Sequence, residues 1–116
     1  MSKIAARKAK SFAHDAEIDW ADSAPGIRRK ELCFDDNIML VRFQFETGAV
    51  GPEHKHPHKQ CSVIESGVFD VTIAGKTERL RAGDSYLVAP NLLHGATSVE
   101  PGVIVDAFSP LREDFL

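Results

Sequence analysis

Hydrophobic and polar residues alternate along much of the chain with the period of two that is typical of β-strands. In segment 39–46 every odd position is apolar, and the even positions from 42 onward are polar. Farther along, Phe69, Val71 and Ile73 fall on one face of another predicted strand. Both segments therefore predict a sheet with one apolar face that packs on a core.

Turn-forming residues separate the predicted strands, which follow one another at intervals of about 8 to 12 residues. We expect strands at residues 27–34, 38–46, 61–65, 68–73, 77–80, 85–88, 96–99 and 102–108. Charged and apolar residues mix in segment 27–34, as they do on an edge strand, and the turn at Ser66 and Gly67 predicts a hairpin. Almost no helix is predicted, so the pattern favours an all-β sandwich or barrel.

The length of 116 residues fits one domain, and an apolar content of 43% is ordinary for a chain that buries a core. Residues 1–16 lack a steady period, so we interpret them as a flexible tail that precedes a single domain at 17–116. This tail is basic but has no apolar core, unlike a signal peptide. The longest apolar runs are much shorter than the roughly 20 residues of a spanning helix. We therefore expect a cytoplasmic protein with no membrane partner.

Charge and cysteine content narrow the environment and the partners of the protein. A net charge of -3 and a pI near 5.9 argue against nucleic acid as a partner, because nucleic acid requires a basic face. Cys33 and Cys61 occur in apolar stretches, so we expect reduced thiols in the core. Small sandwiches expose sheet edges, which favours a homodimer with segment 27–34 at the interface.

Three of the five histidines lie within five residues. His54 and His56 are two residues apart, so on an extended strand their imidazoles project from one face, as two ligands of one metal ion must. Pro57 then interrupts the strand. Gln60 returns its side-chain carbonyl to the same point if the chain folds back as a hairpin, whereas His58 is out of step and is expected at the rim.

A second stretch runs from a turn at Gly83, through an apolar strand, to His94. Together the two stretches resemble the two motifs of the cupin superfamily. The first motif, G-x5-H-x-H-x3-E-x6-G, is matched by Gly48, His54, His56 and Gly67, with Gln60 in place of the usual glutamate. The second, G-x5-P-x-G-x2-H-x3-N, is matched by Gly83 and His94, whereas Ala89, Asn91 and Ser98 depart from it.

This resemblance implies a double-stranded β-helix, or jelly-roll cupin barrel, that holds one divalent transition metal ion. The implied ligands are His54, His56, Gln60 and His94. Imidazole-rich sites accept zinc, nickel, manganese, iron or copper, so the identity of the metal stays open. Because three imidazoles and an amide are neutral, the ion would keep its double positive charge and attract a small anionic or sugar-like substrate.

The end of the chain carries a further group, in which Asp106 and Phe108 share one strand face and Arg112 follows. An acid–base group, an aromatic ring and a guanidinium suit an enzyme that acts on a sugar acid. A purely structural pairing of Asp106 with Arg112 is equally open. The pattern also resembles small single-domain cupins of pectin and alginate breakdown, which convert 4,5-unsaturated uronates to open-chain keto forms. This resemblance implies catalytic roles for Asp106, Phe108 and Arg112.

Two other functions stay open. A cupin dioxygenase would need a redox metal, and a carboxylate is better suited than Gln60 to stabilising oxidised iron. A non-catalytic cupin would hold a small acid, as cupin domains in regulators do, but the sequence shows no DNA-binding segment. We therefore favour Lewis-acid or proton-transfer chemistry on a uronate.

Overall fold

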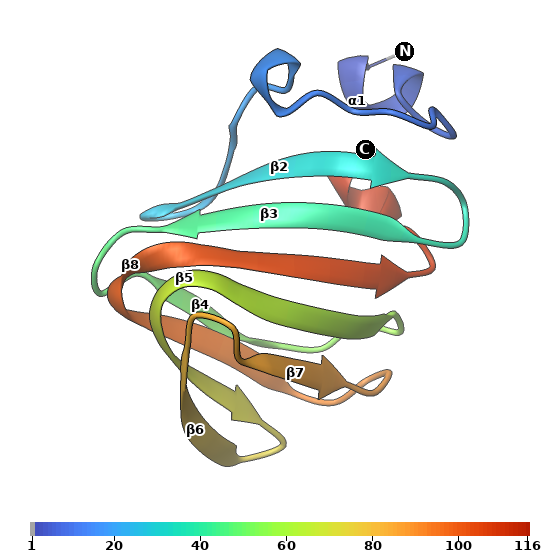
Figure 1. Cartoon of the computed structure of the whole chain (residues 1–116). Helices are drawn as coiled ribbons and strands as arrows, with labels where there is room; N and C mark the ends of the chain where they lie inside the picture. Colours follow the sequence, from blue (N-terminus) through green and yellow to red (C-terminus); the bar gives the residue numbers. More distant parts are fainter. Residues whose placement is uncertain (1) are drawn as a thin grey trace.

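The computed structural model describes residues 2–116, and strands make up most of it (Figure 1). The strands are β1 (Ala21–Ala24), β2 (Ile27–Phe34), β3 (Met39–Phe45), β4 (Val50–His54), β5 (Lys59–Ile73), β6 (Lys76–Arg81), β7 (Ser85–Val88) and β8 (His94–Ser109). The helical elements are short: α1 (Lys3–Ala6) and the 3₁₀ turns η1 (Asp15–Glu17) and η2 (Glu113–Phe115). The predicted all-β class is confirmed.

The strands form one sheet that folds over on itself, because its two longest members, β5 and β8, are strongly curved (Figure 1). The second half of β8 pairs with β3 and with the first half of β5. Its first half pairs with β4 and with the second half of β5. In the same way, β7 and β6 pair with opposite halves of β5. The result is two layers of antiparallel strands, which is the predicted jelly roll.

Two glycines allow β5 and β8 to bend against each other. Gly67 has a φ of 83°, which favours glycine, and a Cβ on Gly102 would lie 2.1 Å from the carbonyl oxygen of Ser66. The predicted hairpin at Gly67 is therefore wrong, because this residue bends one continuous strand, Lys59–Ile73, instead of reversing the chain. A glycine with positive φ serves either purpose, so the local sequence does not distinguish them.

Two clusters of buried hydrophobic residues make up the core. The larger contains Ile27, Phe45, Ala49, Ile64, Phe69, Val71 and Ile104. The second contains Phe34, Met39, Val41, Phe108 and Leu111. The odd positions of β3 contribute to both clusters, which confirms the alternation predicted for this segment. Phe108, a predicted site residue, is thus also a core residue.

The outer side of β2 is covered by other parts of the chain. β1 pairs with its first residues, and the N-terminal segment runs along the rest (Figure 1). There the Ala9 N–H donates to the carbonyl of Phe34 at 2.8 Å, and the Arg7 guanidinium donates to the carbonyls of Glu31 and Leu32. The prediction of an edge strand at 27–34 is therefore wrong. The division into a flexible tail at 1–16 and a domain at 17–116 stays a prediction, and Met1 lies outside the described residues.

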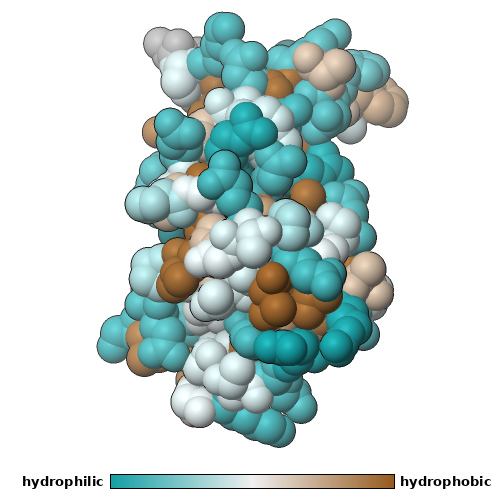
Figure 2. All heavy atoms as spheres, turned by 90° about the vertical axis from the view of Figure 1, so that its left-hand side faces the viewer, coloured by the Kyte–Doolittle hydropathy of each residue, from teal (hydrophilic) through white to brown (hydrophobic). Residues whose placement is uncertain are grey.

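The outer surface holds both cysteines, Cys33 and Cys61. The prediction that they are core residues is wrong, because in β5 the neighbours Gln60 and Ser62 point inward and leave Cys61 on the outer face. Figure 2 shows one side of the molecule, where hydrophobic residues form small groups among hydrophilic ones. Within residues 2–116 we find no helix long and apolar enough to cross a membrane.

Candidate active site

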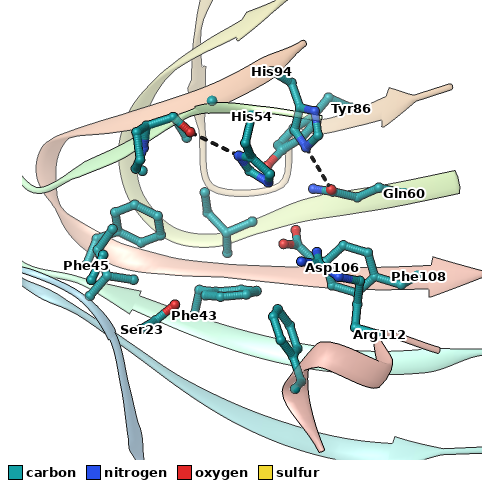
Figure 3. Close-up of a pocket in the computed structure, with 18 residues that line it drawn as sticks. Ser23, Phe43, Phe45, His54, Gln60, Tyr86, His94, Asp106, Phe108 and Arg112 are labelled. Carbon is teal, nitrogen blue, oxygen red and sulfur yellow. Dashed lines mark hydrogen bonds between the residues drawn. The ribbon is translucent and has the colours of Figure 1, made fainter. Parts of the chain in front are cut away.

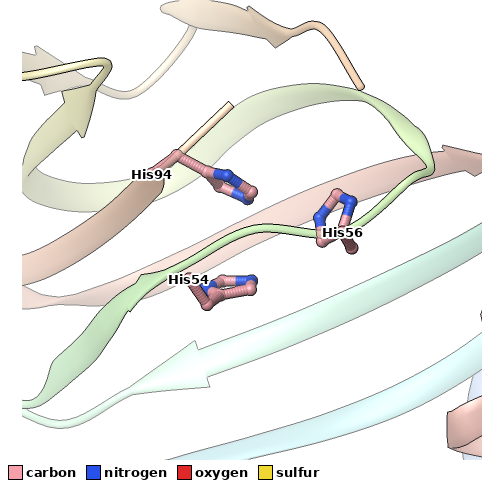
Figure 4. Close-up of side chains that lie close together, drawn as sticks. All are labelled: His54, His56 and His94. Atoms are coloured by element: carbon pink, nitrogen blue, oxygen red, sulfur yellow. The ribbon is translucent and has the colours of Figure 1, made fainter. Parts of the chain in front are cut away.

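Three histidines converge between β4 and β8 (Figure 4). His54 ends β4 and lies opposite His94, which begins β8, so strand pairing brings together two residues that are 40 positions apart. His56 follows in the turn before β5. One nitrogen from each ring lies within 4.8 Å of the others. The convergence predicted from the spacing is confirmed, although only His54 of the first pair lies in a strand.

Each of these imidazoles is oriented by a backbone carbonyl two residues away in the sequence. The Nδ1–H groups of His54, His56 and His94 donate to the carbonyls of Pro52, His58 and Leu92 at 2.9, 3.1 and 2.8 Å, respectively. A carbonyl only accepts hydrogen bonds, so Nδ1 carries the proton in all three rings and Nε2 keeps a free lone pair. This is the arrangement that holds a histidine ready to bind a metal through Nε2.

Burial favours the neutral form of two of these imidazoles, His56 and His94. Desolvation lowers the pKa of His56, although a hydrogen bond to Gln60 opposes it, and desolvation likewise lowers the pKa of His94. The nearby positive charge of Arg112 lowers both pKa values further, because it disfavours a second positive charge on either ring. Because a metal binds the neutral imidazole, the site is prepared for a cation at neutral pH.

The side-chain oxygen of Gln60 lies close to two of the histidine rings. Oε1 lies 3.0 Å from Nε2 of His56 and 3.1 Å from Nε2 of His94. With the protons on Nδ1, these contacts bring lone pairs together, which a cation between them would stabilise. Ligands about 2.1 Å from one ion and at right angles to each other lie roughly 3.0 Å apart. The contacts of Gln60 with His56 and His94 match this spacing, and the three histidines form a possible metal site.

Asp106 lies on β8 and is buried in the same region. Its Oδ1 accepts a hydrogen bond from the Ser62 hydroxyl, which in turn accepts one from Nε2 of Gln60 at 3.1 Å. Desolvation raises the pKa of Asp106 to about 7, although Ser62 and the positive charge of Arg112 oppose this shift. A carboxyl group with this pKa can both donate and accept a proton near neutral pH.

Arg112 directly precedes the 3₁₀ turn η2, and its side chain lies over two aromatic rings. Its guanidinium carbon is 5.0 Å from the ring centre of Phe108 and 4.3 Å from that of Phe115. The guanidinium also donates two hydrogen bonds to Asp114 at 3.0 and 2.8 Å. The structural pairing of Asp106 with Arg112 that the sequence left open is therefore not formed, because Ser62 and Asp114 are the direct partners.

One cavity of about 240 Å³ joins the two groups of residues (Figure 3). Its wall includes His54, Gln60, His94, Asp106, Phe108 and Arg112. Sequence reasoning missed further lining residues, notably Tyr86 on β7, and burial raises the pKa of this phenol. It also missed Ser62, since a serine within a strand carries no motif. His58 donates from Nε2 to the carbonyl of Leu111 at 3.1 Å and is not in the histidine cluster.

Comparisons with known proteins agree with the fold. The cupin domain family matches residues 41–108. The pectin degradation protein KdgF of Dickeya dadantii (strain 3937) is 41% identical over 104 residues, which is 88% of this chain and 94% of that protein.

Two solved structures are similar over nearly the whole chain. An RmlC-like cupin from Shewanella frigidimarina NCIMB 400 has a TM-score of 0.91 at 36% identity and covers 95% of this chain and 99% of its own. KdgF from Halomonas sp. has a TM-score of 0.88 at 38% identity, with coverage of 93% and 100%. With the family match over more than half of its length and a relative 41% identical over 88% of it, this chain belongs to the cupin family.

Proposed function

We propose that this protein is a metal-dependent enzyme that converts 4,5-unsaturated uronates to open-chain keto sugars. The observation that carries the proposal is the shared cavity, in which the histidine and glutamine cluster faces a buried acid, Asp106, and a guanidinium, Arg112 (Figure 3). A cation site, a proton-transfer group and a carboxylate-binding group are what this reaction on a sugar acid requires.

Substrate binding follows from the shape and charge of the cavity. A volume of about 240 Å³ is somewhat below the roughly 300 to 1,000 Å³ of pockets for drug-sized ligands, which favours a monosaccharide over a polymer. The Arg112 guanidinium suits the uronate carboxylate, because its planar fork matches two carboxylate oxygens. The ring of Phe108 provides an apolar surface next to it. A bound divalent metal ion would supply Lewis-acid polarisation of substrate oxygens.

The chemistry needs one group that moves protons. In the opening of the hemiacetal ring, the hydroxyl on carbon 1 loses its proton and becomes an aldehyde, while the bond between carbon 1 and the ring oxygen breaks. The ring oxygen gains a proton, which leaves an enol at carbon 5. The enol hydroxyl then loses its proton, and carbon 4 gains one, so that a ketone forms with no net change in atoms or electrons. Asp106 suits both transfers, because burial raises its pKa to about 7.

The relatives support the same substrate class. A curated relative is named a pectin degradation protein, and a similar structure carries the same protein name. The dioxygenase alternative is less well supported, because the neutral Gln60 stands where a carboxylate would stabilise oxidised iron. A purely binding role does not explain a buried acid with a raised pKa in the cavity wall.

The test is an absorbance assay with the metal-loaded protein. The conjugated ring of an unsaturated uronate absorbs in the ultraviolet, and this absorbance disappears when the ring opens. We expect the protein to accelerate the loss for unsaturated monomers released from pectin or alginate, measured against a blank for the uncatalysed opening. Loss at the rate of the blank with galacturonate, mannuronate and guluronate products would reject the proposal.

We also propose that the protein is a cytoplasmic homodimer. The strands β1, β4, β6 and β7 each pair with one other strand and so lie at edges of the sheet, and exposed edges are commonly covered by a partner chain. The predicted contact through segment 27–34 is disfavoured, because β1 pairs with the first residues of β2 and Arg7 and Ala9 donate hydrogen bonds to its later carbonyls. Light scattering should give twice the monomer mass of 12.7 kDa, and a monomer at micromolar concentration would reject the dimer.

A further inference from the structure

A line of three buried side chains connects the histidine cluster to the acid. Gln60, Ser62 and Asp106 are 4%, 1% and 6% exposed, respectively. Gln60 and Ser62 both point inward from β5, and β8 pairs Ser62 with Asp106. Strand pairing therefore fixes the backbone of all three residues, and the Ser62 hydroxyl lies between the amide and the carboxylate.

The hydrogen bonds along this line have a defined direction. Nε2 of Gln60 only donates, so the Ser62 oxygen accepts at 3.1 Å and keeps its own proton for Oδ1 of Asp106. With its nitrogen bound to Ser62, the Gln60 amide turns Oε1 toward Nε2 of His56 and His94. Ser62, which lies on the side of the amide away from the histidines, thus determines how the Gln60 amide is oriented.

We propose that Ser62 is a positioning residue that orients two functional groups at once: the Gln60 oxygen toward the metal and the Asp106 carboxyl toward the substrate. Because Oδ1 of Asp106 is held by the Ser62 hydroxyl, Oδ2 is the oxygen that exchanges protons. The half of this inference that concerns Asp106 rests on the proposed function, whereas the half that concerns Gln60 does not.

The hydrogen bonds from Gln60 to Ser62 and from Ser62 to Asp106 explain why an amide suits position 60. A glutamate there would have no N–H to give to Ser62, and its second oxygen would compete with Asp106 for the single hydroxyl proton. It would also place a second negative charge near the buried carboxylate of Asp106. Gln60 supplies an oxygen for the metal and a hydrogen-bond donor for Ser62 from one planar group, without the negative charge of a carboxylate.

The test of the Gln60 half is the metal affinity of Ser62→Ala. Loss of the hydroxyl frees the Gln60 amide to rotate, so we expect affinity for Zn²⁺, measured by competition with a chelator, to fall about tenfold, as it does when partners of metal ligands are removed. The matched control is Ser98→Ala, which removes a buried serine hydroxyl that donates to the carbonyl of Glu100, away from the cavity. Wild-type affinity in Ser62→Ala, or an equal loss in Ser98→Ala, would overturn this half.

The test of the Asp106 half is a double-mutant cycle on uronate turnover, with wild type, both single variants and the double variant all saturated with metal. If Ser62 acts through Asp106, Ser62→Ala should lower kcat about tenfold with little change in KM in the wild-type background, and should cost nothing more in Asp106→Asn. Equal losses in both backgrounds would overturn this half. If the wild-type protein shows no turnover at all, the proposed function and this half fail, and the metal affinity alone decides the role of Ser62.

Discussion

The two sides of the cavity are built in different ways. On the histidine side, each ring is held by a carbonyl two residues away in the sequence, as with His54 and Pro52. On the acid side, Asp106 is held by Ser62, which lies 44 positions away, and Arg112 by stacking on Phe108 and Phe115. The histidine rings are thus oriented by local backbone geometry, whereas the acid itself, Asp106, depends on a side chain from a distant part of the chain.

Because the two sides are built differently, metal binding on the histidine side should be separable from proton transfer and substrate binding on the acid side. Local carbonyls fix the tautomer of His54, His56 and His94 whether or not a substrate is present. The acid side, in contrast, gains its properties from burial, which raises the pKa of Asp106. Substitutions on the two sides should therefore give different outcomes: loss of metal on one, and loss of rate or substrate affinity with the metal retained on the other.

The largest effect is expected from breaking the histidine side. The double variant His54→Ala/His56→Ala removes two of four proposed ligands, so its metal content by elemental analysis should fall to nearly zero and turnover should vanish with it. His14→Ala, which changes an exposed histidine, should keep full occupancy. Full occupancy in the double variant would show that the ligands are assigned wrongly.

The next largest effect is expected from Asp106→Asn on the acid side. The amide has the shape of the carboxyl but does not transfer protons, so uronate turnover should fall on the order of 10²-fold or more with metal content unchanged. Asp70→Asn, which changes a surface aspartate paired with Arg79, is the matched control and should turn over substrate normally. Near-normal turnover in Asp106→Asn would assign the proton transfer to another group.

A smaller effect is expected from Arg112→Lys. Lysine keeps the charge but not the planar fork, so kcat/KM for a uronate should fall roughly 10-fold while metal content stays the same. Arg79→Lys alters a comparable arginine that donates two hydrogen bonds to Asp70 far from the cavity, and should leave kcat/KM unchanged. Equal kcat/KM in Arg112→Lys and wild type would remove Arg112 from substrate binding.

The last prediction concerns stability instead of turnover, and it is the pH dependence of folding without metal. The folded protein raises the pKa of Asp106 to about 7 from 3.8, so it binds this proton more tightly than the unfolded chain does. The stability that the proton contributes is complete below pH 3.8 and is lost as the pH rises through about 7. The melting temperature of chelator-treated wild type relative to Asp106→Asn should therefore fall between pH 4 and pH 8. A constant difference would mean that Asp106 titrates normally.

The sequence by itself determined the class of fold and the histidine side. Alternation in segment 39–46, with turns at regular intervals, predicts paired strands because each strand has a period of two. The spacing of His54, His56, Gln60 and His94 matches a family motif, and in the structure these residues converge. The alternation is local, because each strand depends on a few neighbouring residues. His94 was found through the family motif instead, because only the pairing of β4 with β8 brings it to His54.

Only the tertiary structure decided the rest. The bend at Gly67, the coverage of β2 by Arg7 and the exposure of Cys61 all depend on which strands pair, and no local pattern reports that. The same holds for Ser62, which becomes significant only because β5 and β8 pair it with Asp106. Pairing between distant strands sets burial and hydrogen-bond partners, and these decide the pKa of Asp106 and the orientation of Gln60.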